Sequence, residues 1–382
     1  MHFIKKIIRT LFRLTFNFFH KLRDSFDPRL YSKRHRVSGI INGKSSHHSS
    51  SVAIFVLYQK QNIPFYARNV LRILNSLHVD VVVTVNNDIG QAQIDWLINN
   101  CYLLILRENF GRDFGAYKDA INILDLDQYQ KLLLVNDSLT YFSKNLDHLF
   151  KYFINSSKNL ITLTENFDKE WHAQTHFLSL SKEIFLCENF KRFWNEYKPF
   201  NSRPHSIFNG EIKFSKDVLS AYMHDRDVYY GVDKIINVFS AGDIFLEDEE
   251  ESALLSLLPD IDEDRNVLIQ FMKWRLRYGD NSDLKIISNL EYIAVKSVLA
   301  LVEKKNSSHS LAFIGPFITK TCVIKRDLVF RESFSLTQIG VVLKKLGLDT
   351  SEIQQTIYEL TAKGSVSRIN LYKRLKASLG LL

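Results

Sequence analysis

Two glycines bracket a cation and a carboxylate in the stretch ENFGRDFGAYKDAI, residues 108–121. Gly111 can adopt a backbone conformation that is closed to other residues, and it allows a ligand to approach the chain. The helical pattern that follows offers free N–H groups and a positive dipole end, which suit an anion. Arg112 adds a guanidinium group that can grip a phosphate through two hydrogen bonds. The stretch therefore predicts an anion site, although Asp113 also fits a helix cap.

Two further clusters of polar residues each follow an apolar run that is typical of a buried strand. In open α/β folds, ligands bind in a crevice outside the carboxyl ends of the parallel strands. We therefore expect these clusters and the glycine-bracketed stretch to line one crevice. The second cluster also fits a turn, because all three of its residue types favour turns. The clusters are Asn86, Asn87 and Asp88, and then Asn136, Asp137 and Ser138.

Strand-like and helix-like patterns alternate from Ser51 onward. The strand-like runs are rich in Val, Ile and Leu and are bounded by polar residues. Between them, apolar residues recur at helical spacing, as in residues 64–74. This alternation predicts an α/β fold whose mostly parallel sheet is covered by helices on both faces. The strand-like runs lie at 51–58, 79–88, 101–109, 131–139 and 160–166.

The spacing of glycines and cysteines disfavours several common sites. The glycines match neither the dinucleotide-binding pattern G-x-G-x-x-G nor the P-loop pattern G-x-x-x-x-G-K-[ST]. Cys101, Cys187 and Cys322 lie far apart and form no C-x-x-C pair. The cysteines therefore indicate reduced thiols in the cytosol rather than a disulfide framework or a zinc site.

The net positive charge of the chain is confined to residues 1–36. They hold ten Lys or Arg and two Asp, a balance of +8 that equals the net charge of the whole chain. On a helical wheel, Phe and Leu side chains fall opposite the basic ones, which is typical of a helix lying in a membrane interface. The apolar run is too interrupted for a signal peptide or a membrane span. The alternative is a helix docked on the body of the protein, whereas binding to nucleic acid would leave the phenylalanines unexplained.

The order of these motifs resembles the nucleotide-sugar-binding half of a GT-A glycosyltransferase. More narrowly, it is similar to the rhamnan synthesis protein F family of bacterial polysaccharide and O-antigen assembly. The glycine-bracketed motif is the most specific part of this likeness, and a late stretch ends in the family's Lys-Arg-acid-Leu pattern. The segments that carry the likeness are residues 109–120, 132–138, 172–194, 209–219 and 309–331.

The resemblance implies a transferase that moves rhamnose or a related deoxyhexose from a nucleoside diphosphate donor, dTDP-rhamnose, to a lipid-linked glycan. It also implies a cytoplasmic protein that is peripheral on the inner face of the cell membrane. The alternative is a transferase-like subunit without catalysis, which binds glycan or scaffolds a synthesis complex. The residues expected to meet the donor are Asn86, Asn87, Asp88, Asn109, Gly111, Arg112, Asp113, Lys118, Asn136 and Ser138.

The resemblance places Asp137 where GT-A enzymes carry an Asp-x-Asp metal motif. The outer positions of this triplet are Asn136 and Ser138, so only the central carboxylate remains. Hard cations such as Mg²⁺ and Mn²⁺ prefer carboxylate oxygens, which makes the triplet a poor metal cage. Either Asp137 holds a divalent cation together with water and phosphate oxygens, or cations such as Arg112 and Lys118 offset the charge of the leaving diphosphate.

Displacement of a diphosphate requires a general base that removes the proton of the attacking hydroxyl. Glu165 follows the fifth strand-like run, His172 begins a family-like segment, and Glu211 lies in the stretch NGEIKFS. Each also has a structural alternative, as a helix cap, a hydrogen-bonded imidazole or a surface charge. We expect one of the three to act as the base beside a catalytic Asp137.

The patterns divide the chain into five parts. Residues 1–36 form the basic amphipathic segment, and residues 37–50 form a Ser-rich linker. Residues 51–245 form the GT-A-like nucleotide-sugar-binding and catalytic domain. Helical patterns indicate an acceptor-side region at 246–335 and C-terminal helices at 336–382. The last of these helices is again basic and amphipathic, and it fits either the body of the protein or the membrane that the N-terminus would contact.

Overall fold

The structure is a computed structural model. It describes residues 14–15, 18–19, 21–45, 48–59, 62–167, 170–231, 234, 307–310, 312–331, 333–365 and 371–378. The expected acceptor-side region at 246–335 is therefore described only from residue 307 onward.

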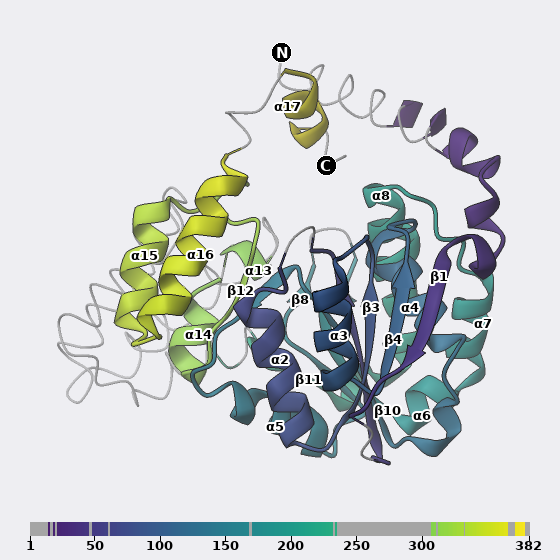
Figure 1. The fold of residues 1–382 in the computed structure, drawn as a ribbon, viewed down its shortest axis with the longest axis horizontal. Helices are drawn as coiled ribbons and strands as arrows, with labels where there is room; N and C mark the ends of the chain where they lie inside the picture. The colour runs from purple at the N-terminus through teal and green to yellow at the C-terminus, as the bar shows by residue number, and fades with distance from the viewer. Residues whose placement is uncertain are drawn as a thin grey trace, which may run out of the picture.

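An eight-stranded sheet runs through the centre of the molecule (Figure 1). Its strand order is β1-β4-β3-β2-β5-β10-β7-β11. The strands run in one direction except β1 and β10, which are antiparallel to their neighbours. The sheet is thus mostly parallel, and the predicted α/β class is confirmed. The strands are β1 (Val37–Asn42), β2 (Ser51–Leu57), β3 (Asp80–Val85), β4 (Leu103–Arg107), β5 (Lys131–Asn136), β7 (Leu160–Thr162), β10 (Phe177–Ser181) and β11 (Arg226–Val228).

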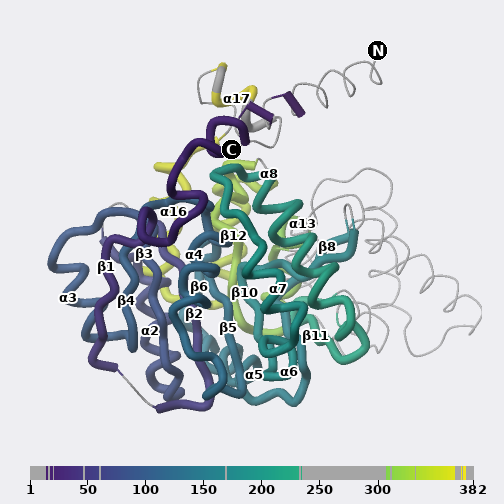
Figure 2. The backbone as a smooth tube through the Cα atoms, turned by 90° about the vertical axis from the view of Figure 1, so that its right-hand side faces the viewer, coloured from purple at the N-terminus to yellow at the C-terminus, as the bar shows by residue number. Residues whose placement is uncertain are grey.

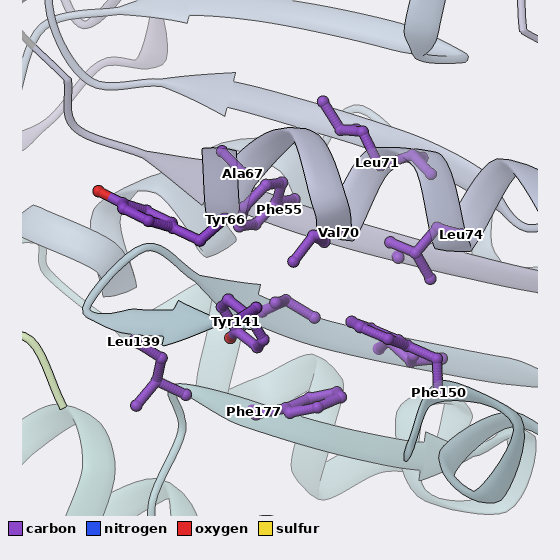
Figure 3. Close-up of a cluster of buried hydrophobic side chains, with 14 of the residues drawn as sticks. Phe55, Tyr66, Ala67, Val70, Leu71, Leu74, Leu139, Tyr141, Phe150 and Phe177 are labelled. Atoms are coloured by element: carbon purple, nitrogen blue, oxygen red, sulfur yellow. The ribbon is translucent and has the colours of Figure 1, made fainter. Parts of the chain in front are cut away.

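Helices cover both faces of this sheet, because the inner strands are apolar on both sides. Successive residues of a strand point to opposite faces, so Phe55 of β2 packs on one side and Ile54 on the other. Figure 3 shows the first side, where Phe55 lies among Tyr66, Val70 and Phe150. The helices of that side are α2 (Phe65–Ser76), α3 (Gln91–Asn100) and α5 (Leu146–Asn155), and those of the other are α4 (Arg112–Ile121), α6 (Lys182–Leu186) and α7 (Glu188–Glu196).

The order in which strands are added to the sheet reverses between β2 and β5. From β2 the chain moves outward to β3 and β4, and it then returns to place β5 on the other side of β2. In this pairing Val56 lies beside Asn136, near the carboxyl ends of both strands. A crevice forms outside the strand ends at such a reversal. The polar triplet that begins at Asn136 therefore stands at the point where the topology favours a ligand.

The C-terminal part of the chain folds back onto the α/β body. Strand β12 (Val323–Lys325) pairs with β6 (Leu139–Tyr141), which directly follows β5. Buried Glu352 accepts hydrogen bonds from Asn69 Nδ2 at 2.7 Å and from the backbone N–H of Ser143 at 3.0 Å. These contacts join the C-terminal helices to α2 and to the end of β6. The helices are α13 (Ser307–Ser310), α14 (Ile314–Thr319), α15 (Leu336–Lys345), α16 (Thr350–Lys363) and α17 (Leu371–Ser378).

Several short elements connect these parts. They are the 3-10 helices Pro28–Leu30, Lys33–His35, Leu126–Gln128 and Ser220–Asp225, the strands β8 (Glu165–Asn166) and β9 (His172–Ala173), helix α8 (Arg203–His205), and the π-helices Ser206–Ile212 and Ser215–Leu219.

The prediction of a flexible linker at residues 37–50 is wrong. Residues 37–42 form β1, which pairs with β4 at the edge of the sheet. The backbone N–H of Gly43 then donates to Tyr102 O at 2.8 Å, and a side chain at Gly43 would collide with the carbonyl of Cys101. Serines and glycines made this segment resemble a linker, but every second residue of the strand is half-buried against β4.

The N-terminal segment is described only in part. Residues 14–15, 18–19 and 21–25 are helical, and we call these residues the N-terminal helix. The remainder of the predicted amphipathic helix lies outside the described residues, so its amphipathic character stays a prediction. Further along, Arg36 donates two hydrogen bonds to buried Asp119 of α4. None of the helices in the described part of the chain is long and apolar enough to cross a bilayer.

Candidate functional site

The glycine-bracketed motif forms the turn between β4 and α4. Gly111 has a φ of +78°, which favours glycine, and a Cβ there would lie 2.4 Å from Cβ of Pro199. Arg112 also has a positive φ, +56°, although it carries a side chain. Such a backbone conformation is strained for a residue other than glycine, and strain of this kind concentrates at functional sites. Helix α4 has no side-chain cap, so the interpretation of Asp113 as a cap is wrong.

The second glycine of the motif makes room for a buried arginine. A Cβ at Gly115 would lie 2.4 Å from Phe110 O and 3.1 Å from Nη2 of Arg107. Arg107 donates from Nη2 to Phe110 O at 2.7 Å, from Nη1 to Asn86 Oδ1, and from Nε to Asp119 at 3.1 Å. Arg107 thereby ties the turn to the end of β3. No separate sequence signal marks Arg107, because it stands inside a strand-like run.

The motif and the polar triplet after β5 come together. Asn136 Nδ2 donates to Asp113 Oδ2 at 3.0 Å, and Asn136 Oδ1 accepts from the backbone N–H of Ser138 at 3.0 Å. Burial raises the pKa of the Asp113 carboxyl, while the neighbouring Arg112 and Lys325 lower it. The predicted convergence of the two clusters is thus present for these residues.

Asp137 bridges the two strands at the reversal of the sheet. Its Oδ2 accepts from the backbone N–H of Tyr58 at 2.8 Å and from the side-chain amide of Gln59, both of which follow β2. Arg326 Nη1 lies 3.7 Å from the same oxygen and donates to Asp137 O at 2.8 Å. Burial raises the pKa of the Asp137 carboxyl to about 6, although Arg326 and the Tyr58 N–H oppose this rise.

Arg326 reaches this position because β12 pairs with β6. The stretch Lys325-Arg326-Asp327-Leu328 is the late Lys-Arg-acid-Leu pattern, and the pairing sets Lys325 beside Leu139. The sequence indicated that this pattern belongs to the family likeness, but nothing in it specified contact with the triplet after β5. Arg326 and Asp137 are 189 residues apart in the chain, and only the fold shows that they are in contact.

Arg112 and Lys325 lie near Asp113, and a third cation, Arg203, lies near both of them. Burial lowers the pKa of Arg203 to about 10, and the positive charges of Arg331 and Arg112 contribute to this shift. Arg112 and Arg203 are therefore close to each other. Burial lowers the pKa of half-buried Lys325, and Arg203 adds to this effect. Among the residues that the structure describes, no hydrogen-bond or ion-pair partner is found for the charged groups of Arg112, Arg203 or Lys325. Like charges held together without partners form a site that an anion would stabilise.

Glu211 stands at the edge of this group of cations. It lies in the π-helix Ser206–Ile212, a form of helix that is frequent at functional sites. Its Oε1 accepts from the backbone N–H of Thr175 at 2.9 Å. The Glu211 carboxylate is near enough to Asp113 to help raise its pKa, and near enough to Lys325 to oppose the lowering of the pKa of that lysine. Of the three predicted base candidates, Glu211 is the one that the fold brings to the cations.

The other two base candidates have structural partners away from this group. Glu165 accepts from Trp171 Nε1 at 2.6 Å and from Arg226 Nε at 3.0 Å. His172 is buried in β9, and its Nδ1 lies 2.9 Å from Glu170 O. Glu165 is therefore an ion-paired carboxylate and His172 a hydrogen-bonded imidazole, which are structural roles.

Lys118 does not join the crevice. Its ammonium group donates to the carbonyl oxygens of Trp194, Asn195 and Tyr197, at the end of α7. An ammonium group has three donors, and all of them are occupied by this helix end. The ammonium group of Lys118 is thus occupied within the fold, which disagrees with the prediction that it offsets the charge of a leaving diphosphate.

The residues predicted to contact the nucleoside differ in their burial and in their hydrogen-bond partners. Asn86 is buried, accepts from Arg107, and leaves its Nδ2 without a partner in the described part of the chain. Asn87 holds the turn after β2 by accepting from Gln59 N at 2.9 Å and donating to Gln59 O. Asp88 and Asn109 are exposed. The buried, unpartnered Nδ2 of Asn86 is the strongest indication of a ligand among them.

The donor set around Asp137 does not fit a divalent cation. The carboxylate already accepts two N–H bonds and faces a guanidinium group, and its neighbours Asn136 and Ser138 are neutral. Asp113, the nearest other carboxylate of the site, is hydrogen-bonded to Asn136. Across the described residues there is no group of three or more His, Cys, Asp or Glu that could hold a metal ion.

Comparison with known proteins agrees with the motif-based likeness. Residues 81–230 match the model of the family described as rhamnan synthesis protein F. The family resemblance is confirmed over these residues, which include α4, the triplet after β5 and Glu211. An uncharacterised protein of Sinorhizobium fredii, y4gN, is 26% identical over 175 residues, which are 44% of this chain and 46% of that protein. This chain thus spans less than half the length of that relative.

A solved structure was also found. The glycosyltransferase GlyE of Streptococcus pneumoniae TIGR4 aligns with 65% of this chain and 64% of its own, at 14% identity and a TM-score of 0.27. At this score the alignment carries no argument about the site.

Proposed function

We propose that the chain is a glycosyltransferase of polysaccharide synthesis that uses a nucleoside diphosphate sugar. The observation that carries this is the group of Arg112, Arg203 and Lys325, three cations for which no hydrogen-bond or ion-pair partner is found among the described residues. A diphosphate would accept hydrogen bonds from these cations, and guanidinium groups bind phosphate through paired hydrogen bonds. The match to the rhamnan synthesis family supports the same conclusion.

Arg112 is the central cation of this proposal. It stands at the first position of α4, where the free N–H groups of the helix also attract an anion. Arg203 and Lys325 would take the remaining phosphate oxygens, and they would offset the charge that develops on the leaving diphosphate. Asn86, whose Nδ2 has no hydrogen-bond partner among the described residues, would donate to the nucleoside.

Glu211 is the proposed general base. Only its Oε1 has a hydrogen-bond partner within the described residues, so Oε2 is available to accept a proton. In the reaction, an acceptor hydroxyl gives its proton to Glu211, and its oxygen forms a bond to the anomeric carbon. The bond from that carbon to the diphosphate breaks, and the electron pair leaves with the diphosphate. The proposed donor sugar is a deoxyhexose such as rhamnose, and the proposed acceptor is a lipid-linked glycan.

The test is a screen of the purified full chain against nucleoside diphosphate sugars, scored by release of free nucleotide. We expect release with a deoxyhexose donor in the presence of a glycan acceptor. Arg203→Gln should lower the affinity for nucleoside diphosphate by about ten- to a hundredfold, because a charge-assisted bond is lost. Lys216→Gln is the control, since the side chain of this lysine is 67% exposed and pairs with Glu170.

Two results would contradict the assignment. The first is affinity for nucleoside diphosphate that stays unchanged in a folded Arg203→Gln variant. The second is binding of nucleotide without turnover of any donor, which would favour the alternative of a non-catalytic glycan-binding or scaffold subunit.

A further inference from the structure

We propose that the N-terminal helix and α17 together form a surface that binds anionic phospholipid bilayers and turns the mouth of the crevice toward the membrane. The first observation is the exposure of large apolar side chains on both helices. Phe18 and Phe26, at the N-terminal helix and just after it, are 62% and 82% exposed, and Leu371 of α17 is 83% exposed. Leu14, Phe19 and Leu22 are also exposed. Side chains of this size enter the boundary between headgroups and acyl chains.

The positive charge beside these apolar side chains indicates which partner the surface binds. Residues 1–36 hold the whole net charge of +8, and Lys373 and Arg374 of α17 are exposed. Negative lipid headgroups complement basic residues that flank an apolar face. A second copy of this chain would bring like charges together, which opposes association. An anionic bilayer is therefore the occupant that matches both the apolar and the basic side chains.

The N-terminal helix is fixed to the loop between α7 and α8. Buried Asp24 accepts from the backbone N–H of Asn201 at 2.8 Å, and Lys21 Nζ lies 6.0 Å from the ring centre of Phe200. The same loop holds Pro199 against Gly111 and continues into Arg203. A membrane bound by this helix would consequently lie next to the three cations.

The two helices lie at the same end of the molecule. Figure 1 shows α17 and the described pieces of the N-terminal helix beyond α8, and Figure 2 shows the same arrangement after a turn of 90°. Because α8 begins with Arg203, this is the end at which α4 and the crevice begin. Two separate points of attachment would set the orientation of the crevice, whereas one helix alone would leave the body free to rotate.

Vesicle sedimentation with the full chain tests the surface. We expect wild type to sediment with vesicles that contain phosphatidylglycerol, to bind weakly to pure phosphatidylcholine vesicles, and to lose affinity as salt is raised. The double variant Phe18→Glu/Phe26→Glu should lower the partition coefficient at least about tenfold, because two rings no longer enter the bilayer and two negative charges are brought beside anionic headgroups. Leu371→Glu should lower it less. Val341→Glu of α15 is the matched control, since Val341 is exposed on a helix that lies far from α17 in Figure 1.

Hydrogen exchange with and without vesicles tests the orientation. Amides of residues 198–203 should gain protection on vesicles, and those of α15 should not. Thermal unfolding must show that each variant is folded. Equal sedimentation of wild type and the folded Phe18→Glu/Phe26→Glu variant would overturn the inference. Concentration-dependent dimers that need Phe18 and Phe26 but ignore vesicles would also overturn it, in favour of an interface between copies. Protection that appears on α15 instead of residues 198–203 would refute the orientation.

Discussion

Arg326 and Asp137 meet at the end of β5, although 189 residues separate them in the chain. Arg326 lies between two carboxylates, since its Nη1 is 3.7 Å from Asp137 Oδ2 and its Nη2 is 3.3 Å from Glu359 Oε2. Its guanidinium carbon is also 4.9 Å from the ring centre of Tyr66. The contact fastens α16 and β12 to the crevice. Arg326 therefore joins β12 and α16 to the end of β5.

Asp137→Asn should stabilise the protein at neutral pH while removing activity. The pKa of this carboxyl rises from 3.8 to about 6 on folding, mainly through burial. The folded chain consequently binds an additional proton between about pH 4 and pH 6, and the free energy of unfolding falls as pH rises through this window. Removing the titrating group should raise the free energy of unfolding by about 1–3 kcal/mol at pH 7.5. Urea unfolding at pH 7.5 and at pH 4 measures the difference, which should vanish at the lower pH.

A lower stability of Asp137→Asn than of wild type at pH 7.5 would contradict this account, because it would mean that the pair with Arg326 outweighs the burial of the carboxylate. Full transferase activity of the folded variant would instead show that the charge of Asp137 has no role in the reaction.

Arg112→Gly should separate the strain of the turn from the function of the cation. A positive φ costs a residue with a side chain about 1–2 kcal/mol, and glycine avoids this cost. We expect Arg112→Gly to unfold at higher urea than Arg112→Ala, which keeps the strain. Both variants should lose affinity for a nucleoside diphosphate, by about ten- to a hundredfold in calorimetry. A folded Arg112→Gly protein with the affinity of wild type would leave the motif as a structural turn only.

Local patterns were sufficient to predict the α/β class and the meeting of two polar clusters. The strand-like runs correspond to β2, β3, β4 and β5, because strands buried on both faces are continuous apolar runs. The convergence of Asp113 with Asn136 followed from the rule that strand ends meet at one edge. The sequence also singled out Arg112, whose positive φ could not be foreseen.

Other features depend on contacts that no local pattern records. Strand β1 was hidden because an edge strand with serines and glycine resembles a linker, and its pairing with β4 is a contact across some 70 residues. Lys118 was mistaken for a donor-binding cation, since the end of α7 that it caps lies 76 residues further along the chain. Arg203 and Lys325 enter the site through a tertiary arrangement, and neither has a spacing signal relative to Arg112.

Glu211→Gln should slow turnover without weakening donor binding. The amide keeps the size of the side chain and can still accept from Thr175, but it cannot take up a proton. Loss of a general base typically lowers turnover by a factor of about 10² to 10⁴. Glu165→Gln provides the comparison, because Glu165 pairs with Arg226 away from the cations. A fall in nucleotide affinity with unchanged turnover would assign Glu211 to binding and would reopen the search for the base.

The last prediction concerns the buried group formed by Arg36, Asp119 and Arg107. Asp119 is fully buried and accepts from Arg36 Nε at 3.0 Å and from Arg107 Nε at 3.1 Å. Arg107 in turn holds Phe110 O, so Asp119 supports the turn that carries Gly111. Asp119→Asn leaves two buried cations without a carboxylate, and we expect a loss of about 3–5 kcal/mol in the free energy of unfolding.

A double-mutant cycle with Arg36→Met shows whether the three charges act as one unit. Arg36→Met alone leaves the pair of Asp119 and Arg107 intact, so its cost should be smaller than that of Asp119→Asn. In the double variant only one cation lacks its carboxylate, and the combined loss should be less than the sum of the single losses by about 1 kcal/mol or more. Urea unfolding of the four proteins gives this coupling. Additive losses would show that Arg36 and Asp119 contribute separately, and that the N-terminal segment does not support the turn through Asp119.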